Sequence, residues 1–369
     1  MKVVLIPSSV EAVGVATHVL NLARLLRDAG ILEAVICPAD GWLAKELEID
    51  GVPFEVVKLS YKPSRFVYSN IRLFYWLIRR KSAGVVHFHG RFPLLVALLS
   101  MIMLRGRRFV VTVHQFSGTG NPGLFAWKNG VEVFIWRHLV KKVCCVSEAL
   151  GREVRGRLGV NHANKVEVIK NWISPANDLP AECEPNPEPA PAGAIKIIGI
   201  GRLANEKGFD VLVDAVRILV EKGFYVNCDI FGDGSEANNL AALIDRYGLK
   251  ECVKLAGRHK NVRSILPIYD ALVIPSRMES FGLVALEAYE AEVPVIASDI
   301  PGLNEVVQDK ITGMLFNMED PSHLAEQLSA LVCDEALGEA LISQGKRLAK
   351  AYMDSDARLE EYQKVYGFA

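Results

Sequence analysis

The sequence has no cysteine pattern that would support a disulfide framework or a zinc site. Its seven cysteines are an odd number and none forms a Cys-x-x-Cys pair, the spacing typical of zinc ligands and redox centres. Long apolar runs are also missing. The most apolar stretch, residues 93–104, is too short to span a bilayer and favours a buried helix. The first ten residues, MKVVLIPSSV, lack the regions of a signal peptide and are typical of a first strand. We therefore expect a soluble cytoplasmic protein.

The chain also lacks an excess of charge of either sign. It holds 42 Lys and Arg against 43 Asp and Glu, a balance that gives no reason to expect a nucleic-acid partner. The charge is unevenly placed, because residues 1–180 hold 24 basic and 13 acidic residues, whereas the remaining chain holds 18 basic and 30 acidic residues. A basic first half is suited to an anionic membrane surface or an anionic substrate.

Short β-branched runs alternate with longer amphipathic segments along both halves of the chain. The runs, such as residues 85–89 and 271–275, are almost continuously apolar, which predicts parallel sheets covered by helices on both faces. Five prolines within residues 180–193 forbid a helix or a central strand there and predict an extended linker. We expect an α/β fold with two doubly wound, Rossmann-like domains, over residues 1–179 and 194–350.

The most distinctive segment is ESFGLVALE, residues 279–287, at the junction of a strand and a helix. The first amides of a helix lack internal partners and carry the positive end of its dipole. A helix that begins near Gly282 therefore offers an anion site suited to a phosphate. Glu287, about two turns into that helix, could accept hydrogen bonds from a diol, and Glu279 lies where a sugar on that phosphate would sit. The alternative is an ordinary turn with two exposed glutamates.

A second motif, GIGRLANEKG, occupies residues 199–208 after the first strand of the second half. Arg202 and Lys207 lie on either side of this loop, and a guanidinium fork together with an ammonium group suits a diphosphate. The glycine spacing alone is weak evidence, because the full Gly-x-Gly-x-x-Gly pattern is missing. A solvated turn with two surface cations remains the alternative.

These motifs, with FGDG at residues 231–234 between them, resemble in order and spacing the donor-binding half of the family 4 retaining glycosyltransferases. Weaker matches in the first half are Gly14, VVHFHG, TVH and VSEALGREV. The resemblance implies the GT-B architecture, in which two Rossmann-like domains face each other across a cleft, and a C-terminal helix, residues 351–369, that crosses back to the first domain. It also implies that no metal or other cofactor is needed.

The resemblance assigns roles to individual residues. Arg202 and Lys207 would neutralise the departing diphosphate, and such charge stabilisation is commonly the largest catalytic term. Glu287 would hold the ribose. Glu279 would act on the donor sugar, as a positioning and electrostatic group or as a nucleophile, and His114 would be a second catalytic residue near that sugar.

Further contacts implied by the resemblance fall on the two substrates. On the donor side they are Gly14, Gly232, Arg258, Ser280, Phe281, Gly282 and Leu283. On the acceptor side they are His89 and Ser117. One departure is Asn171-Trp172, which stands where resembling proteins have an Asn-Gly turn, so the local turn must differ.

Two histidines, His87 and His89, alternate along one expected strand and suggest a metal pair at first sight. Neither a carboxylate nor a third ligand lies near them in the sequence, so we expect no metal there. His89 is better explained as lining the acceptor cleft. We expect His18 to pack at the start of a helix, and a purely structural role remains the alternative for His114. The single Asp-x-Asp, residues 354–356, is interpreted as solvated surface.

Residues 70–81, NIRLFYWLIRRK, combine apolar and basic side chains. The apolar ones include Leu73 and Leu77. Because each basic residue near an anionic surface contributes about 1 kcal/mol, we hypothesise that the first half docks on a membrane and takes a lipid-linked glycan. The alternative is a helix packed on its sheet with ordinary basic ends.

Together these features predict an enzyme that transfers a sugar from a nucleotide-sugar donor, a UDP- or GDP-sugar, to a glycan or lipid-linked glycan in cell-surface polysaccharide biosynthesis. We place it in the cytoplasm or at the inner face of the membrane. The alternatives are a soluble small-molecule glycosyltransferase, a sugar-nucleotide epimerase of the same architecture and a non-catalytic nucleotide-sugar binder. A dinucleotide dehydrogenase is disfavoured, because the Rossmann fingerprint is missing after residues 2–6.

Overall fold

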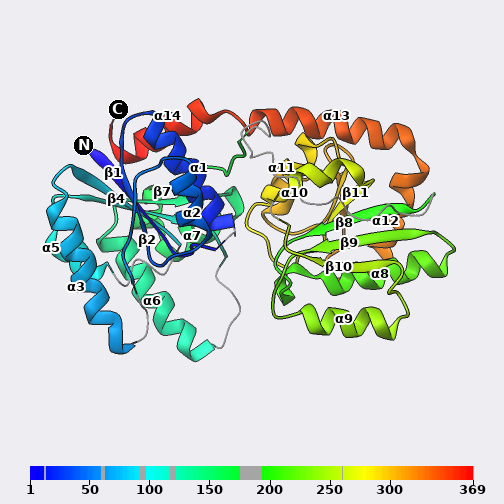
Figure 1. Cartoon of the computed structure of the whole chain (residues 1–369). Helices are drawn as coiled ribbons and strands as arrows, with labels where there is room; N and C mark the ends of the chain where they lie inside the picture. Colours follow the sequence, from blue (N-terminus) through cyan, green and yellow to red (C-terminus); the bar gives the residue numbers. More distant parts are fainter. Residues whose placement is uncertain are drawn as a thin grey trace. The chain divides into compact units, whose positions relative to one another are not determined.

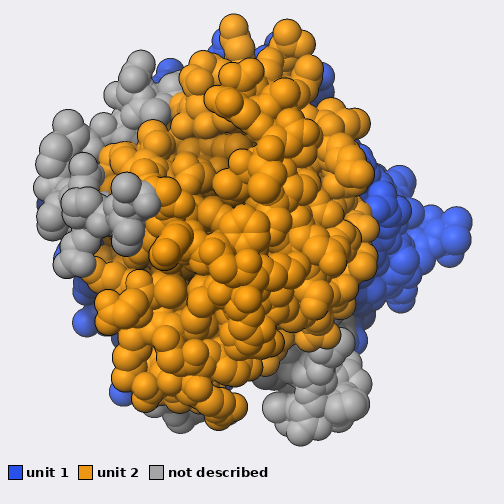
Figure 2. Space-filling view, turned by 90° about the vertical axis from the view of Figure 1, so that its right-hand side faces the viewer, with its two compact units in different colours: residues 1–172, 354–369 blue, residues 173–353 orange. Residues whose placement is uncertain are grey.

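The computed structural model describes most of the chain, and it divides into two compact units. The first unit comprises Met1–Trp172 and Asp354–Ala369, and the second comprises Ile173–Met353 (Figure 2). The described residues are 1–11, 14–59, 63–90, 97–116, 122–174, 193–259 and 261–368, without the side chains of 63, 64, 66 and 122–129. The expected linker, residues 180–193, lies outside them except for Gly193. We describe each unit by itself.

The first unit contains a seven-stranded sheet in which every strand pair is parallel, in the order β3-β2-β1-β4-β5-β6-β7. Its strands are β1 (Lys2–Pro7), β2 (Leu32–Cys37), β3 (Phe54–Val56), β4 (Ala83–His89), β5 (Arg108–Val113), β6 (Lys142–Cys145) and β7 (Val166–Val168). The central strands are buried along almost their whole length. Both faces of the sheet are therefore covered, as the continuous apolar runs predict.

The helices of the first unit are α1 (Gly14–Asp28), α2 (Trp42–Ile49), α3 (Pro63–Arg79), α5 (Leu98–Met103), α6 (Pro122–His138), α7 (Glu148–Leu158) and α14 (Ser355–Tyr366), with the 3-10 turn η1 (Val160–Lys165). One core joins α1, α2 and α14 to the sheet, and in it the rings of Tyr362 and Tyr366 are fully buried. Helix α14, the C-terminal helix, lies beside α1 (Figure 1). Its N-cap is Asp354, whose Oδ1 accepts a hydrogen bond from the Ala357 amide, so Asp354 has a local structural role.

The second unit contains a six-stranded parallel sheet in the order β10-β9-β8-β11-β12-β13. Its strands are β8 (Ile195–Ile200), β9 (Val226–Phe231), β10 (Val253–Gly257), β11 (Ala271–Ile274), β12 (Val295–Ser298) and β13 (Met314–Phe316). Its helices are α8 (Phe209–Glu221), α9 (Ala237–Arg246), α10 (Val262–Ile265), α11 (Leu283–Glu290), α12 (Pro321–Cys333) and α13 (Glu335–Ala351), with the 3-10 turns η3 (Asn205–Lys207), η4 (Leu266–Ile268) and η5 (Leu303–Glu305). The predicted doubly wound parallel sheets are confirmed in both units.

In each sheet the strand order reverses beside the first strand, between β1 and β4 in one unit and between β8 and β11 in the other. The connections on the two sides of such a switch point leave for opposite faces of the sheet, so a crevice opens at the carboxyl ends of the strands and serves as the usual ligand site. Among the described residues, no helix is long and apolar enough to cross a membrane.

Candidate functional site

The switch point of the second unit is built by close contacts between backbones. Gly208 has φ +65° and ends the loop after β8, and a Cβ there would overlap the carbonyl oxygen of Pro275. Gly232, after β9, faces the carbonyl oxygen of Gly201 equally closely. Only glycine allows both approaches. The loops after β8, β9 and β11 therefore form one backbone assembly, which positions the side chains that they carry.

Lys207 and Glu279 meet at this switch point. The Lys207 ammonium forms an ion pair with Glu279 Oε2, and the Ser280 amide donates to Glu279 Oε1 at 3.2 Å. The side chains of Lys207 and Glu279 are 24% and 19% exposed, respectively, so both charges face a partly desolvated site. The structure thus brings together the two motifs that lie far apart in the sequence.

Helix α11 begins directly beside this ion pair. Its N-cap is Gly282, in the left-handed region at φ 90°, and no side chain caps the helix. Ser280 and Phe281 are buried, and the Phe281 ring packs on Tyr352 at 5.6 Å between ring centroids. Phe281 therefore anchors the turn, while the first amides of α11, from Leu283 onward, carry the positive end of the helix dipole next to Lys207. This arrangement suits a phosphate group.

Glu287 lies on α11, but nearer to its start than expected. It is the fifth residue of that helix, little more than one turn from Gly282. Its carboxylate lies 3.5 Å from Arg263 Nε, and Arg263 Nη1 also lies 3.2 Å from Glu290. Burial raises the pKa of Glu287, and the neighbouring Arg263 opposes this shift. Arg263 also donates to the carbonyl oxygen of Ser174 at 2.7 Å, and the sequence motifs gave no sign of it.

Arg202 and Arg258 form ion pairs of their own, separate from those of Lys207 and Arg263. The Arg202 side chain is 57% exposed and pairs with Glu206, four residues farther along. Arg258 is 63% exposed and lies 3.8 Å from Asp233. Both guanidinium groups stand at the carboxyl edge of the sheet, where solvent access leaves them able to turn toward a ligand. Ser117, expected on the acceptor side, lies outside the described residues.

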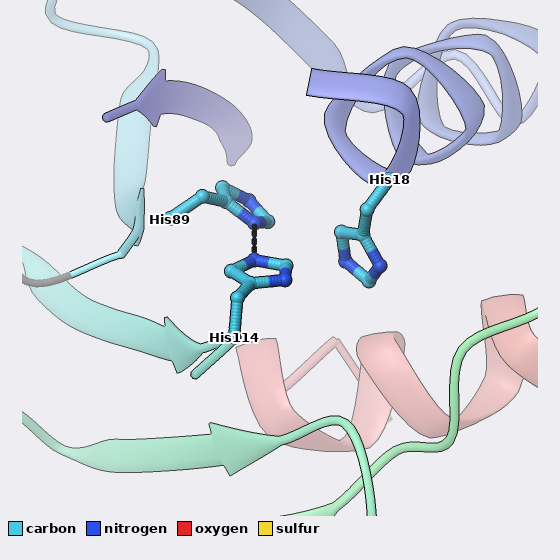
Figure 3. Close-up of side chains that lie close together, drawn as sticks. All are labelled: His18, His89 and His114. Carbon is cyan, nitrogen blue, oxygen red and sulfur yellow. Dashed lines mark hydrogen bonds between the residues drawn. The ribbon is translucent and has the colours of Figure 1, made fainter. Parts of the chain in front are cut away.

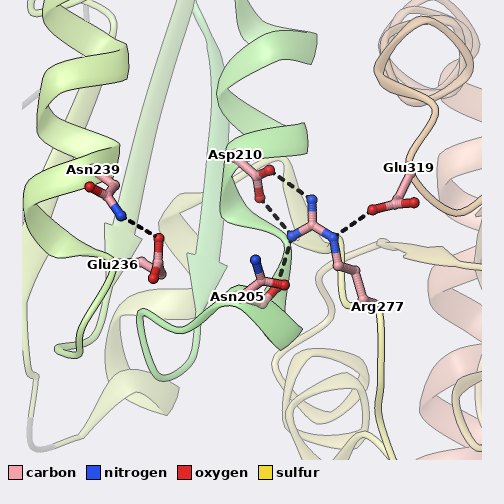
Figure 4. Close-up of polar contacts among 6 residues, drawn as sticks. All are labelled: Asn205, Asp210, Glu236, Asn239, Arg277 and Glu319. Atoms are coloured by element: carbon pink, nitrogen blue, oxygen red, sulfur yellow. Dashed lines mark hydrogen bonds and ion pairs between the residues drawn. The ribbon is translucent and has the colours of Figure 1, made fainter. Parts of the chain in front are cut away.

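Arg277 is a second residue that the sequence motifs did not reveal. Its guanidinium donates two hydrogen bonds, of 2.9 and 2.7 Å, to the Asp210 carboxylate. It also donates hydrogen bonds to the Glu319 carboxylate and to the Asn205 carbonyl oxygen (Figure 4). This fork ties the loop after β11 to the start of α8. A hollow of about 430 Å³ lies beside it, and its lining includes Asp210, Asp214, Glu236 and Arg246. Because acidic side chains outnumber basic ones in this lining, the hollow is poorly suited to a phosphate.

The switch point of the first unit holds a cluster of histidines. His18 lies on α1, His89 ends β4 and His114 follows β5, and their rings point toward one another (Figure 3). The ring of His18 lies 5.3 Å from that of His89 and 4.8 Å from that of His114 between centroids. His114 is the most exposed of the three, at 8%. The predicted catalytic and acceptor-side histidines are therefore neighbours at a ligand edge.

Burial lowers the pKa of all these rings. The pKa of His18 falls to about 4, although a hydrogen bond to Asn171 opposes the shift. The pKa values of His89 and His114 fall well below 6.5, chiefly through burial and further through the neighbouring histidines. His87 is similarly shifted and bonds Tyr366 and Thr112 at 2.7 Å. At neutral pH the cluster is uncharged.

Asn171 and Trp172, which stand where resembling proteins have an Asn-Gly turn, both contact His18. The Asn171 amide oxygen lies 2.7 Å from His18 Nδ1, and the buried Trp172 ring meets His18 edge-on at 5.0 Å between centroids. Asn171 and Trp172, at the end of the segment Met1–Trp172, therefore fix the orientation of the His18 ring. Gly14 begins α1, the helix that carries His18.

Comparisons with known proteins agree with this architecture. The family model described as "Glycosyltransferase Family 4" matches residues 13–177, and the one described as "Glycosyl transferases group 1" matches residues 182–348. An uncharacterized 41.2 kDa protein in the cps region of Klebsiella pneumoniae is 30% identical over 342 residues, covering 88% of each chain. The lipopolysaccharide core biosynthesis glycosyltransferase LpsD of Rhizobium meliloti is 27% identical and covers 99% of this chain and 98% of its own. The structure of Anabaena HepE in complex with UDP-glucose superimposes with a TM-score of 0.85 at 20% identity, with full coverage of both chains.

Proposed function

The chain belongs to the family 4 glycosyltransferases of GT-B fold, and from this premise we propose that it transfers a sugar from a UDP- or GDP-sugar with retention of configuration. The acceptor would be a glycan or lipid-linked glycan of the cell surface. A relative named for lipopolysaccharide core synthesis and a structural neighbour that holds UDP-glucose support this assignment.

The observation that carries the proposal is the Lys207–Glu279 ion pair beside the uncapped start of α11. A diphosphate would compete with Glu279 for the Lys207 ammonium and would also receive the amides of α11. Glu279, released from Lys207, could then accept hydrogen bonds from hydroxyl groups of the donor sugar. Donor binding would thereby convert a resting ion pair into two substrate contacts.

The transfer would need no protein nucleophile. The bond between the anomeric carbon and the diphosphate oxygen breaks, and the acceptor oxygen bonds to the same face of the sugar. The acceptor proton passes to the departing phosphate oxygen. Lys207, with Arg202 turned inward, stabilises the charge on that oxygen. Glu287 and Arg263 hold the nucleoside of the donor. His114 contacts the donor sugar. We propose that neither a metal nor a cofactor takes part.

A panel of nucleotide sugars tests the donor assignment. One donor should raise the unfolding temperature and undergo slow hydrolysis, and Arg202→Ala should abolish both effects. Arg217→Ala is a matched control, because Arg217 is also paired with a glutamate four residues farther along but lies on α8, away from the loop. Binding of no nucleotide sugar, or equal binding by Arg202→Ala, would contradict the proposal. A changed nucleotide sugar formed without acceptor would identify an epimerase instead.

For the proposed membrane contact, helices α3 and α5 offer an exposed apolar face that differs from the one the sequence suggested. Leu73 and Leu77 are fully buried, so they cannot face lipid. The exposed apolar side chains lie elsewhere on these helices, at Val67, Tyr68, Ile71, Tyr75, Ile78, Ile102 and Met103. An apolar hollow of about 300 Å³ opens between the helices, lined mainly by Val67, Ile71, Leu98, Leu99 and Ile102.

We propose that this face meets the inner, anionic leaflet and receives the hydrocarbon of a lipid-linked acceptor. The six described cysteines, all free thiols, fit a reducing cytoplasm. Sedimentation with anionic liposomes at moderate salt should pull down the wild type, and Ile71→Glu should reduce binding. Val160→Glu is the control, because Val160 is a 94% exposed apolar residue elsewhere in the same unit. Equal sedimentation of both variants would exclude this face.

A further inference from the structure

Three histidines that are far apart in the sequence offer one nitrogen each within 4.8 Å of one another. They are His18, His89 and His114, and all three are buried. We propose that they form a binding site for one transition-metal ion of the Zn²⁺ type, and that the bound metal inhibits the enzyme. Such an ion would regulate the protein and would take no part in the transfer itself.

The spacing of two of the rings already matches metal coordination. His89 Nδ1 and His114 Nε2 are 3.3 Å apart. Two imidazole nitrogens on a tetrahedral Zn²⁺, each about 2.0–2.1 Å from the ion, are separated by about 3.3 Å. The His18 ring must turn to complete the site, because a spacing of up to 4.8 Å exceeds that separation. It projects from α1 toward the other two rings (Figure 3).

The hydrogen bonds of the metal-free cluster leave one nitrogen unsatisfied. His89 has no exposed surface, and its Nε2 has no hydrogen-bond partner among the residues that the structure describes. A buried polar atom without a partner is unfavourable. Coordination through Nδ1, the atom that lies 3.3 Å from His114 Nε2, would leave the proton of His89 on Nε2. The metal would therefore not give Nε2 a partner, and its bonds to the three rings must outweigh this cost.

Asn171 prepares His18 for coordination. Its amide oxygen, 2.7 Å from His18 Nδ1, can only accept, so Nδ1 carries the proton and Nε2 presents its lone pair. A second ring N–H bonded to a carbonyl oxygen is the arrangement that orients most metal-bound histidines. In the metal-free protein Tyr362 OH lies 3.1 Å from that Nε2, and the metal would replace this hydrogen bond.

The chemistry of the ligands selects the ion. Three imidazoles without a carboxylate suit Zn²⁺, Ni²⁺ or Cu²⁺, whereas Mg²⁺ and Mn²⁺ prefer oxygen ligands. His89 Nδ1 and His114 Nε2 share a hydrogen bond, so one of them carries a proton, which must move to the other nitrogen of its own ring when both bind the ion. Three protein ligands leave a fourth position of a tetrahedral ion open. Inhibition follows because His114, which contacts the sugar in the proposed function, would be held by the metal; this consequence alone rests on that proposal.

Zinc binding to the full chain tests the site without any donor or acceptor. After removal of metals with EDTA, competition with a chromophoric chelator should show one Zn²⁺ per chain, and Co²⁺ should give the absorption of a tetrahedral complex. We expect Asn171→Ala to weaken binding by about 10- to 100-fold, and His18→Ala and His114→Gln to weaken it further. His138→Ala is the control, because His138 is an exposed histidine of the same unit and should leave the affinity unchanged.

Two further measurements separate binding from folding and from catalysis. Zn²⁺ should raise the unfolding midpoint of the wild type and of His138→Ala but not that of His18→Ala, whose folding is checked by circular dichroism. Zn²⁺ should also inhibit transfer, and EDTA should restore it. Absence of stoichiometric binding, or equal affinity in His18→Ala and His138→Ala, would overturn the site. Stoichiometric binding with an undiminished transfer rate would overturn the inhibition. A chain inactive with every donor would refute the proposed function but leave the binding result standing.

Discussion

Mild acid should destabilise the first unit, because its buried imidazoles must then take up protons. Burial lowers the pKa of His18 to about 4 in the folded chain, against about 6.5 when it is unfolded. Between these values the unfolded chain binds more protons than the folded chain, so stability falls as pH decreases. The contribution of the neutral His18 ring to the free energy of unfolding is fully present above about pH 7 and is lost as the pH falls from 6.5 toward 4.

The magnitude follows from the shift of a single residue. Each pKa unit corresponds to about 1.4 kcal/mol. The shift of His18 alone therefore lowers the free energy of unfolding by about 3 kcal/mol below pH 4 and by about 2 kcal/mol at pH 5, relative to neutral pH. His87, His89 and His114 are shifted in the same direction and add to this loss. Because domains are typically stable by only about 5–15 kcal/mol, the loss is large enough to measure.

Tryptophan fluorescence reports selectively on this unit. All five tryptophans, at positions 42, 76, 127, 136 and 172, belong to it. Urea unfolding followed by fluorescence at pH 7.5, 6.5, 5.5 and 5.0 should show a falling midpoint. His18→Gln should flatten the dependence, and His138→Gln, which changes an exposed ring, should not. A constant midpoint between pH 7.5 and 5.0, or the same slope in His18→Gln as in the wild type, would refute the reasoning.

Three predictions concern the second unit. Lys207→Met should reduce kcat/KM for sugar transfer by about 10²–10³, with the exposed Lys222→Met as control; an unchanged rate would remove Lys207 from the site. Gly208→Ala should lower the unfolding temperature measured by circular dichroism, through about 1–3 kcal/mol of backbone strain and the added overlap with Pro275. Gly223→Ala is the control, because Gly223 also has a positive φ but open space around it. An equal fall in unfolding temperature in both variants would show that the overlap with Pro275 does not contribute. Arg263→Met should destabilise more at pH 8 than at pH 5, because without this cation the pKa of Glu287 rises further and its charged form is penalised; a loss independent of pH would contradict this account.

Most helices and strands could be predicted from the apolar runs and the helical periodicity of the sequence, except where these patterns are weak. Buried parallel strands are apolar throughout, so runs such as 85–89 and 271–275 predict β4 and β11 closely. Helix α6, whose apolar residues are spread around its circumference, has no clear periodicity, and the three-residue edge strands β7 and β13 are too short to show one. These elements could not be predicted from the sequence.

Local patterns along the chain were enough to predict the doubly wound fold and the two loop motifs at residues 199–208 and 279–287, because glycines, loop cations and helix starts act over a few neighbouring residues. Which side chains meet depends on the packing of distant segments. This packing paired Lys207 with Glu279 and placed Arg263 against Glu287. It also joined His18 and His114 to His89, where the sequence suggested only His87 as a partner. The reason is that a parallel sheet collects the carboxyl ends of strands from distant segments at one edge, so spacing along the chain carries little information about which of those ends become neighbours.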